Sequence, residues 1–250
     1  MAPLDFGLDD KACIVTGASR GIGAATARML EEEGAQVLRV SRGGDFACDV
    51  TDPGAGERIL AECLDRFGRV DVLVNNAGTS RAAPLEDLTD DDWHGQWELN
   101  VMAPMRLMKA IAPRMAEAGD GRIVNVTSSS GKRPSPRNAA YSVTKAAQLS
   151  LSRVFADRWA GNGVLVNAVA PGPVATPLWL AEGGLADQSA EQAGVTRDEA
   201  LEQAAAKIPL GRMGSEDEIA AVIVFLCSRH ASNVTGAAWA VDGGAVQLMF

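Results

Sequence analysis

The chain has 250 residues, and its 23 Lys and Arg residues against 32 Asp and Glu residues give a formal net charge of −9 with both histidines neutral. An acidic surface repels phosphate backbones and anionic membranes. The longest apolar run, Ile219 to Cys227, is much shorter than the roughly 18 to 20 residues of a membrane span. We therefore expect a globular protein that binds neither nucleic acid nor membrane.

The cysteines and the N-terminus indicate the compartment. The four cysteines are widely spaced, form no CxxC or Cys/His cluster, and are accompanied by only two histidines. Neither a disulfide framework nor a metal site is expected from such a pattern. Residues 1–10 carry acidic side chains instead of the basic start and apolar block of a signal peptide. We expect a cytoplasmic protein.

The first half of the chain predicts alternating strands and helices. Ala12 to Thr16 is an apolar run typical of a strand, and it ends in a glycine turn. Helical spacing follows at Ile22, Ala25 and Met29 and stops at Gly34. Further strands are predicted at Gln36–Val40, Phe46–Val50 and Val70–Val74, and a helix that starts at Thr51-Asp52-Pro53 lies between the last two.

The second half repeats the pattern. It predicts helices at Asp91–Ala116, Ala139–Ala160 and Glu216–Ser228, and strands at Gly121–Val126, Val164–Val169 and Ala237–Val241. Seven strands alternating with about six helices, mostly with Val/Ile/Leu-rich strands, are typical of a parallel sheet covered on both faces. We predict an α/β Rossmann fold, doubly wound, in one domain over residues 1–250.

Residues 175–209 lack clear strand character. They contain Gly183-Gly184 and Gly194, with a helical stretch near Asp198 to Ala206. Because ligands bind beyond the carboxyl ends of parallel strands, and this segment follows such an end, we predict a lid over a substrate site. A surface excursion without a binding role is the alternative.

A glycine-rich turn, Thr16-Gly17-Ala18-Ser19-Arg20-Gly21-Ile22-Gly23, joins the first strand to the first helix. Without Cβ atoms the backbone can turn tightly and approach a pyrophosphate, while the helix N-terminus presents free N–H groups and a positive dipole end. The turn predicts dinucleotide binding, although its spacing differs from the usual G-x-G-x-x-G.

Together with Asn75-Asn76-Ala77-Gly78 and Tyr141-Ser142-Val143-Thr144-Lys145, this turn resembles the short-chain dehydrogenase/reductase family. Pro171-Gly172 and Asp242-Gly243-Gly244 follow in the family's order, so the resemblance covers essentially the whole chain. It is greatest for the 3-oxoacyl-[acyl-carrier-protein] reductase-like branch. The resemblance implies a nicotinamide-dependent oxidoreductase.

Tyr141 and Lys145 lie four positions apart and therefore on one face of the predicted helix. A phenol titrates near about 10, and a nearby ammonium favours the phenolate and lowers that pKa. The pair can act as a general acid in carbonyl reduction and as a base in reverse. Tyr141 is the only tyrosine in the chain. An amphipathic helix with an incidental Tyr and Lys is the alternative.

The resemblance implies two further catalytic residues. Ser128, at the end of a predicted strand, stands where the family carries its catalytic serine, whose hydroxyl holds the substrate oxygen. Asn100 matches the fourth catalytic position, where the family has a local helix distortion and a water connected to the lysine.

The end of the second predicted strand bears on the choice of cofactor. NAD-binding folds usually place an acid there to bind the ribose hydroxyls, whereas a 2′-phosphate requires a cation. This chain has Ser41 followed by Arg42, with Arg20 in the glycine turn, which favours NADP(H) over NAD(H). The segment after Arg42 is short, and Asp45, if folded back towards the ribose, would reverse the preference.

Matches to the family's motifs imply a larger set of cofactor contacts in the glycine turn, after the second and third strands, and after the fourth and sixth. The set is Gly17, Ser19, Arg20, Gly21, Ile22, Gly23, Ser41, Arg42, Asp49, Val50, Asn76, Ala77, Gly78, Tyr141, Lys145, Pro171, Gly172, Val174 and Thr176.

Substrate and partners are less constrained. Lys132, Arg133 and Arg137, near the catalytic strand end, either attract an acidic substrate or carrier or form an ordinary solvated charge run. Leu178 to Leu180 predict an apolar roof over a small-molecule site. The family pairs long helices between subunits, and the apolar tail Val246–Phe250 fits a subunit contact, so a homotetramer is expected.

Three functions are compatible with these residues. The first is an NADP(H)-linked reductase of a 3-oxoacyl-type or similar ketone, or the reverse alcohol dehydrogenase. The second is an NAD-dependent dehydrogenase of a cyclic diol, polyol or sugar. A non-catalytic dinucleotide sensor is the third, and the complete set of four catalytic residues argues against it.

Overall fold

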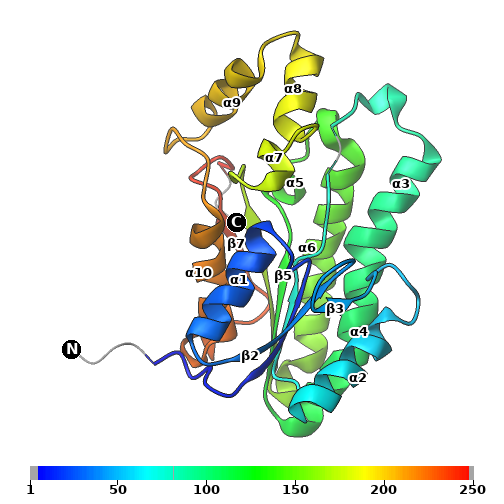
Figure 1. The fold of residues 1–250 in the computed structure, drawn as a ribbon, viewed down its shortest axis with the longest axis vertical. Helices are drawn as coiled ribbons and strands as arrows, with labels where there is room; N and C mark the ends of the chain where they lie inside the picture. The colour runs from blue at the N-terminus through cyan, green and yellow to red at the C-terminus, as the bar shows by residue number, and fades with distance from the viewer. Residues whose placement is uncertain (1–4, 81, 248–250) are drawn as a thin grey trace.

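Seven parallel strands form the central sheet of the computed structural model, which describes residues 5–80 and 82–247 (Figure 1). The strands are β1 (Ala12–Thr16), β2 (Gln36–Ser41), β3 (Phe46–Ala47), β4 (Val72–Asn75), β5 (Gly121–Val126), β6 (Val164–Pro171) and β7 (Ala238–Val241). Their order in the sheet is β3-β2-β1-β4-β5-β6-β7. The direction of winding therefore reverses between β1 and β4, which is where open α/β sheets bind ligands.

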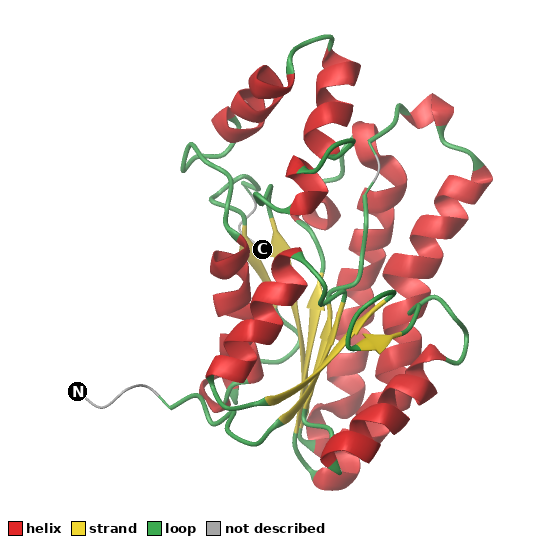
Figure 2. Ribbon diagram, in the orientation of Figure 1, coloured by secondary structure: helices red, strands yellow, loops and turns green. Residues whose placement is uncertain are grey.

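Helices cover both faces of this sheet (Figure 2). The helices α1 (Gly21–Glu32) and α10 (Glu216–Cys227) pack together on one face, and α2 (Ala55–Phe67), α4 (Ala103–Ala118) and α6 (Ala139–Trp159) cover the other. The doubly wound α/β fold predicted from the alternation of elements is confirmed. Among the described residues, no helix combines the length and apolar character needed to cross a membrane.

The buried strands follow from this double cover. All residues of β1 are buried, because successive side chains point to opposite faces and both faces carry helices. Ile14 packs into the core beneath α2 and α4, whereas Cys13 and Val15 pack into the core beneath α1 and α10. Such a strand is apolar throughout instead of alternating, which is why its sequence signal is clear.

The structure corrects the region after β3. The sequence predicts a strand over Phe46–Val50, but β3 ends at Ala47, and α2 begins at Ala55 instead of near Thr51. The Asp49 carboxylate accepts hydrogen bonds from the Thr51 backbone N–H at 2.9 Å and from its hydroxyl at 2.7 Å. This side-chain turn competes with both strand and helix, because it bonds the local backbone itself.

The long helix predicted over Asp91–Ala116 consists of three segments: α3 (Asp90–Trp97), a π-helical segment (Glu98–Met102) and α4. Pro104 explains the interruption, because it has no N–H for the carbonyl of Asn100 and its ring would clash with that carbonyl in a regular helix. The helix distortion expected around Asn100 is confirmed.

Residues 175–209 form three helices at the top of Figure 1: α7 (Pro177–Leu180), α8 (Leu185–Ala193) and α9 (Arg197–Ala206). The predicted stretch corresponds to α9, whereas α8 was missed. Only Ala186 and Ala190 of α8 are buried. The helix has only nine residues and lies between Gly184 and Gly194, and such glycines favour turns and loops.

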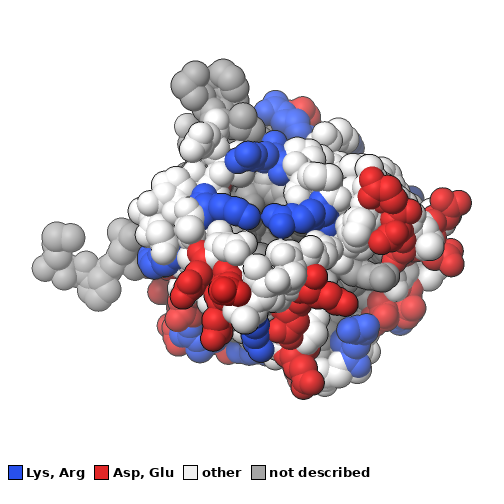
Figure 3. Space-filling view, turned by 90° about the horizontal axis from the view of Figure 1, so that it is seen from above, with Lys and Arg blue, Asp and Glu red and all other residues white. Residues whose placement is uncertain are grey.

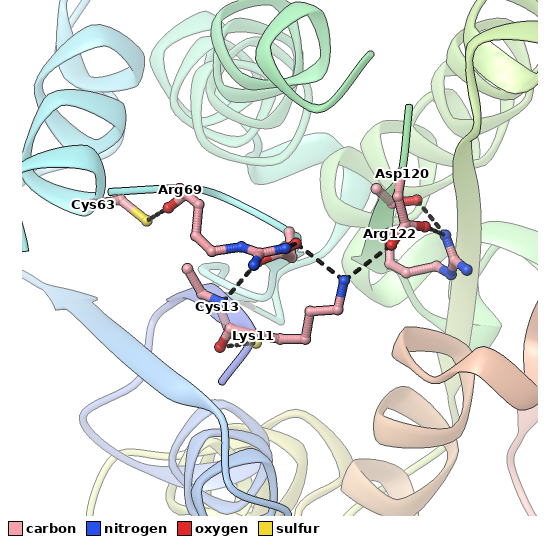
Figure 4. Close-up of polar contacts among 9 residues, drawn as sticks. Lys11, Cys13, Cys63, Arg69, Asp120 and Arg122 are labelled. Atoms are coloured by element: carbon pink, nitrogen blue, oxygen red, sulfur yellow. Dashed lines mark hydrogen bonds and ion pairs between the residues drawn. The ribbon is translucent and has the colours of Figure 1, made fainter. Parts of the chain in front are cut away.

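A network of charged side chains joins the strands at their amino ends, at the opposite end of the sheet from these helices (Figure 4). Lys11 Nζ, just before β1, contacts Asp71 at 3.2 Å and Asp120 at 3.0 Å. Asp71 also contacts Arg69, and Asp120 contacts Arg122 of β5 at 2.7 Å. These ion pairs link the segments entering β1, β4 and β5.

Candidate active site

A cavity of about 700 Å³ opens at the carboxyl ends of the strands, beside the reversal between β1 and β4. It contains every site residue predicted from the sequence except Gly23 and Asn100. Those that line it are Gly17, Ser19, Arg20, Gly21, Ile22, Ser41, Arg42, Asp49, Val50, Asn76, Ala77, Gly78, Ser128, Tyr141, Lys145, Pro171, Gly172, Val174 and Thr176. We refer to it as the central cavity.

The N-terminus of α1 faces the central cavity without a side-chain cap. Arg20 occupies the N-cap position and makes no capping hydrogen bond, and the first turn carries no acidic residue. By contrast, α3, α9 and α10 each begin with a capping box and acidic first-turn residues. The free N–H groups and positive dipole end of α1 therefore suit an anion such as a pyrophosphate.

The residues directly after β4 pack against the glycine turn and hold it in place. Gly17 has φ +66°, and a Cβ there would lie 2.9 Å from Ala77 Cα. Asn76 Nδ2 donates to Thr16 O at 2.9 Å and to Gly17 O at 3.2 Å. A Cβ at Gly23 would lie 2.4 Å from both Asn76 Nδ2 and Gly17 O. Gly23 thus supports the turn by close packing and does not itself line the cavity, and its role as a cofactor contact stays a prediction.

At the other end of the cavity, the β2 terminus presents a serine and a cation. Ser41 and Arg42 line the cavity, and the Ser41 hydroxyl donates to Gly43 O at 2.6 Å. Hydrogen bonds from Thr51 lower the pKa of the nearby Asp49, and the positive charge of Arg42 adds to the effect. Asp45 does not line the cavity and forms an ion pair with Arg66 of α2 at 2.8 Å.

Tyr141 and Ser128 meet in the cavity wall from different elements. Ser128 follows β5, accepts a hydrogen bond from Ser130 N at 3.1 Å, and is the N-cap of the short helix α5 (Ser129–Lys132). Tyr141 lies in the first turn of α6. Burial raises the pKa of the Tyr141 phenol, and a hydrogen bond with the Ser128 hydroxyl partly offsets that rise. At neutral pH the phenol is therefore protonated and can donate.

Lys145 lies one helical turn after Tyr141, with Nζ 5.6 Å from the centroid of the tyrosine ring. Its Nζ donates to Val126 O at 2.9 Å and to Gln148 Oε1 at 2.9 Å. Burial lowers the pKa of Lys145 to about 7. The ammonium was expected to lower the Tyr141 pKa, but burial raises that pKa and only the Ser128 hydrogen bond offsets the rise, so the expectation is corrected.

Asn100 is completely buried behind the cavity wall. Its Nδ2 donates to Gln96 Oε1 at 2.8 Å and to Thr144 Oγ1 at 3.2 Å, whereas Oδ1 has no hydrogen-bond partner among the described residues. A Cβ built on Gly78 would lie 3.3 Å from Asn100 Oδ1 and 3.6 Å from Lys145 Nζ. Both polar atoms therefore approach the same glycine, and Gly78 and Lys145 line the cavity whereas Asn100 does not.

The loop after β6 closes another side of the cavity. Gly172 N donates to Val241 O at 3.1 Å, and a Cβ on Gly172 would lie 2.8 Å from Asp242 Cα. This close approach leaves no room for a side chain at position 172. Val174 and Thr176 line the cavity beyond it.

The sequence analysis missed part of the substrate side. Hydroxyl and amide side chains line the cavity there and come from the loop after β4, from α5 and from the residue before α6. They are Thr79, Ser80, Ser129, Ser130 and Asn138. The roof is apolar and consists of Leu178, Trp179 and Leu185. Thr79, Ser80 and Asn138 had no sequence signal, because single polar residues in loops have no periodicity. Ser129 and Ser130, by contrast, adjoin Ser128 and were expected as wall or turn, and the apolar roof was also predicted.

Charge is unevenly distributed over this end of the molecule. Seen from above, Lys and Arg side chains gather near the middle of the face, and Asp and Glu side chains lie towards its edges (Figure 3). The amine of Lys132 is held by a hydrogen bond to Ala238 O at 2.7 Å, which orients it without removing its charge. Arg133 and Arg137 are exposed.

Comparisons with known proteins agree with this geometry. A family model described as "Enoyl-(Acyl carrier protein) reductase" matches residues 17–246. The chain is 38% identical to D-threitol dehydrogenase of Mycolicibacterium smegmatis over 96% of this chain and 94% of that protein. It is 33% identical to the 3-oxoacyl-[acyl-carrier-protein] reductase FabG of Thermotoga maritima, over 96% and 99% of the two chains.

Among solved structures, L-sorbose reductase of Gluconobacter frateurii, complexed with NADPH and L-sorbose, superposes with a TM-score of 0.91 at 32% identity, covering 98% of this chain and 100% of that one. The chain belongs to the short-chain dehydrogenase/reductase family, which confirms the resemblance noted in its motifs. It is an oxidoreductase that acts with a nicotinamide cofactor on a small-molecule substrate.

Proposed function

We propose that this enzyme interconverts a small ketone and its secondary alcohol with NADP(H), using Ser128, Tyr141 and Lys145 as catalytic residues and Asn100 as their support. The observation that carries the proposal is the convergence of the Ser128 and Tyr141 hydroxyls and the Lys145 amine on a cavity that also receives the uncapped N-terminus of α1.

The glycine turn and the β2 terminus would hold a nicotinamide cofactor, which in its reduced form would supply the hydride for the carbonyl carbon. The Tyr141 hydroxyl donates its proton to the carbonyl oxygen, since its raised pKa keeps it protonated at neutral pH. The Ser128 hydroxyl holds the same oxygen and stabilises the negative charge that develops on it. Lys145 favours the phenolate that remains, because its positive charge lies one helical turn away. In the reverse direction the phenolate removes the alcohol proton.

Three features support NADP(H) over NAD(H). The β2 terminus offers Ser41 and the cation Arg42 to the cavity, where an acid would repel a 2′-phosphate. Arg20 adds a second cation at the cavity wall. Asp45 would favour NAD(H) if its carboxylate faced the ribose, but it pairs with Arg66.

The polar wall favours a hydroxylated substrate such as a ketose or polyol. Ser130 and Asn138 offer hydrogen bonds to substrate hydroxyls beside the catalytic tyrosine, and D-threitol dehydrogenase and L-sorbose reductase are relatives named for such substrates. A 3-oxoacyl thioester is the second candidate, because the roof formed by Leu178, Trp179 and Leu185 is apolar. Attraction of an acidic carrier would come from the exposed Arg133 and Arg137 and from the charge of Lys132, whose amine is held by Ala238 O.

We further propose that residues 175–209 act as the lid of the substrate site. Trp179 of α7 forms part of the cavity roof. Gln188 Oε1 of α8 accepts a hydrogen bond from Ala82 N at 2.9 Å. This bond connects the helices of the segment to the loop after β4, so opening would break it.

Assembly and location complete the proposal. Trp97 of α3 and Val143 and Val154 of α6 are 43%, 45% and 62% exposed, and such apolar side chains on long helices support helix pairing between subunits in a homotetramer. Val101 and Met108, which follow Trp97 along the same helical region, are buried in the core and are not part of this exposed surface. Of the apolar C-terminal tail, residues 248–250 lie outside the described part.

The four cysteines are free thiols, and this supports a location in the cytoplasm, where thiols are kept reduced.

The test is an assay of ketoses, polyols and 3-oxoacyl thioesters with NADPH and NADH, repeated with Tyr141→Phe. We expect NADPH-dependent turnover of a ketose, and a loss of at least about 10²-fold in kcat in the variant, whose cofactor binding persists. Normal turnover by Tyr141→Phe would refute the catalytic assignment. Greater activity on the thioester would select the second candidate, and sedimentation as a monomer would refute the tetramer.

A further inference from the structure

Behind the central cavity, Lys145 Nζ is bonded to a residue that belongs to none of the sequence motifs. Gln148 lies three positions further along α6, and its Oε1 accepts from Lys145 Nζ at 2.9 Å. Lys145 is 3% exposed and Gln148 is 1% exposed, so this bond is shielded from water. Lys145 lines the central cavity, whereas Gln148 does not.

The two bonds of Lys145 Nζ determine the direction of the third. An ammonium has three N–H donors. Val126 O and Gln148 Oε1 accept two of them. The cavity wall at Gly78 lies close to Nζ, since a Cβ there would be 3.6 Å away. The remaining donor is therefore available to the side on which the cavity lies.

The backbone that carries Gln148 is itself anchored to the sheet. Ser152 Oγ donates to Gln148 O at 2.7 Å and accepts from Asn125 Nδ2 at 2.9 Å. Asn125 Oδ1 in turn accepts from Asn75 Nδ2 at 2.8 Å. These bonds run from the ends of β4 and β5 to one turn of α6. They restrict the movement of Gln148 and hence of its side-chain oxygen.

The chemistry of the acceptor matters as much as its position. An amide oxygen accepts a hydrogen bond but carries no net charge, so it orients an ammonium without neutralising it. Burial alone accounts for the lowered pKa of Lys145, and Tyr141 is the titratable group beside it. A carboxylate at position 148 would change this balance, because it would form an ion pair with the amine.

The charged groups on the elements packed against α6 are exposed or engaged elsewhere. Glu98 of the π-helical segment pairs with Arg106 of α4, and Lys132 of α5 donates to Ala238 O. The exposed ones on α3, α4 and the turn before α6 are Asp90, Asp91, His94, Lys109, Arg114, Glu117 and Arg137. Asp92 caps the start of α3 through Thr89.

We propose that Gln148 is a positioning residue for the reaction: its neutral side-chain oxygen directs the Lys145 amine towards the central cavity while leaving the charge of that amine available to Tyr141. This inference rests on the proposed function, in which Lys145 acts on the Tyr141 phenol. Gln148 itself touches neither substrate nor cofactor in this arrangement.

The test compares Gln148→Glu, which keeps the shape and adds a charge, with Gln148→Met, which keeps the bulk and removes the acceptor. Competitive acetylation of the full-length protein over a range of pH, read by peptide mass spectrometry, reports the protonation midpoint of Lys145 without any assay of turnover. We expect the Lys145 midpoint to rise by about one unit or more in Gln148→Glu and to fall in Gln148→Met. Lys132, in the same digest, should not change in either variant.

The pH profile of kcat/KM gives the second measurement. The pH at which activity falls as Lys145 loses its proton should move up in Gln148→Glu and down in Gln148→Met, and Gln148→Met should lose roughly 10-fold in kcat/KM at neutral pH. Matched changes at Gln203, an exposed residue of α9, should leave the profile unchanged. Thermal melting checks that each variant is folded, and Gln148→Glu, the near-isosteric variant, still gives an answer if Gln148→Met unfolds.

Two results would overturn the inference. One is an unchanged Lys145 midpoint and pH profile in Gln148→Glu, and the other is a loss of activity without either shift, which would indicate a purely structural role. If either result is found while Tyr141→Phe is inactive, the proposed function stands and only the role of Gln148 is refuted. If Tyr141→Phe is fully active, the proposed function itself fails.

Discussion

Arg66 Nη1 of α2 binds Asp45 Oδ2 at 2.8 Å, and Asp45, four positions after the end of β2, does not line the central cavity. Arg42, three positions earlier, lines the cavity. The local balance of charge where the cofactor ribose is proposed to bind therefore depends on a helix that follows in the sequence. A positive site is complementary to a 2′-phosphate and a negative one repels it.

The first prediction concerns this end of the cavity. Arg42→Ala should weaken NADPH binding by roughly 10-fold to 100-fold and leave NADH binding nearly unchanged, because a charge-assisted hydrogen bond to phosphate is lost. Ser41→Asp should go further and favour NADH by repulsion. Binding is measured by fluorescence titration with both cofactors. Arg28→Ala is the matched control, since Arg28 pairs with Glu32 and Asp217 and does not line the cavity. Equal losses for both cofactors would contradict the phosphate role.

The second prediction uses the single tyrosine of the chain. Because the tyrosinate absorption band reports Tyr141 alone, an ultraviolet pH titration should give a midpoint above the ordinary value of about 10. Ser128→Ala should raise that midpoint further, because the hydrogen bond from Ser128 lowers the Tyr141 pKa. Tyr141→Phe serves as the blank and should show no band. A midpoint that is lower in Ser128→Ala would contradict the contact.

The third prediction concerns the glycine turn. Gly23→Ala would place a methyl group 2.4 Å from Gly17 O and Asn76 Nδ2, so the turn must move. We expect at least roughly 10-fold weaker binding of either cofactor, because the backbone N–H groups at the start of α1 lose their alignment. Isothermal titration calorimetry measures the change. Gly95→Ala is the control, since a Cβ at this position of α3 meets nothing within 4 Å. Wild-type affinity in Gly23→Ala would show that the turn tolerates a side chain.

The fourth prediction concerns the amino-end network. Burial tends to raise the pKa of Asp120, but the hydrogen bond from Lys11 and the charge of Arg122 outweigh it and lower the pKa overall. A carboxyl group with a lowered folded-state pKa stabilises the fold above its unfolded pKa of about 3.9, and that contribution is lost as pH falls through the folded value. Because the Asp120 side chain is 49% exposed, the contribution should not exceed about 1 kcal/mol.

Urea unfolding checks this at neutral pH and at about pH 3. Asp120→Asn should be less stable than the wild type at neutral pH, and the difference should shrink in acid, where Asp120 of the wild type becomes protonated. Asp65→Asn, at an exposed position of α2, is the control. A constant difference at both pH values would show that the effect is not electrostatic.

Much of the fold could be read from particular residues because their signals are local. The apolar run of β1, the glycine turn after it and the helical spacing from Ile22 together predict a strand, a turn and a helix. Pairs such as Tyr141 and Lys145 are equally readable, because one helical turn brings them together whatever the rest of the chain does. Errors occurred where a side chain overrides the backbone pattern, as Asp49 does after β3.

By itself, the amino-acid sequence determined the alternation of strands and helices, the glycine turn and the motifs of the family, since each depends on residues close together in the chain. Only the tertiary structure decided that Asp45 pairs with Arg66, that Asn100 Oδ1 approaches Gly78, and that Gln188 of α8 bonds Ala82 after β4. Those relations join residues far apart in the sequence. They depend on how packed helices and loops approach one another, and a local pattern of residue types does not predict such long-range contacts.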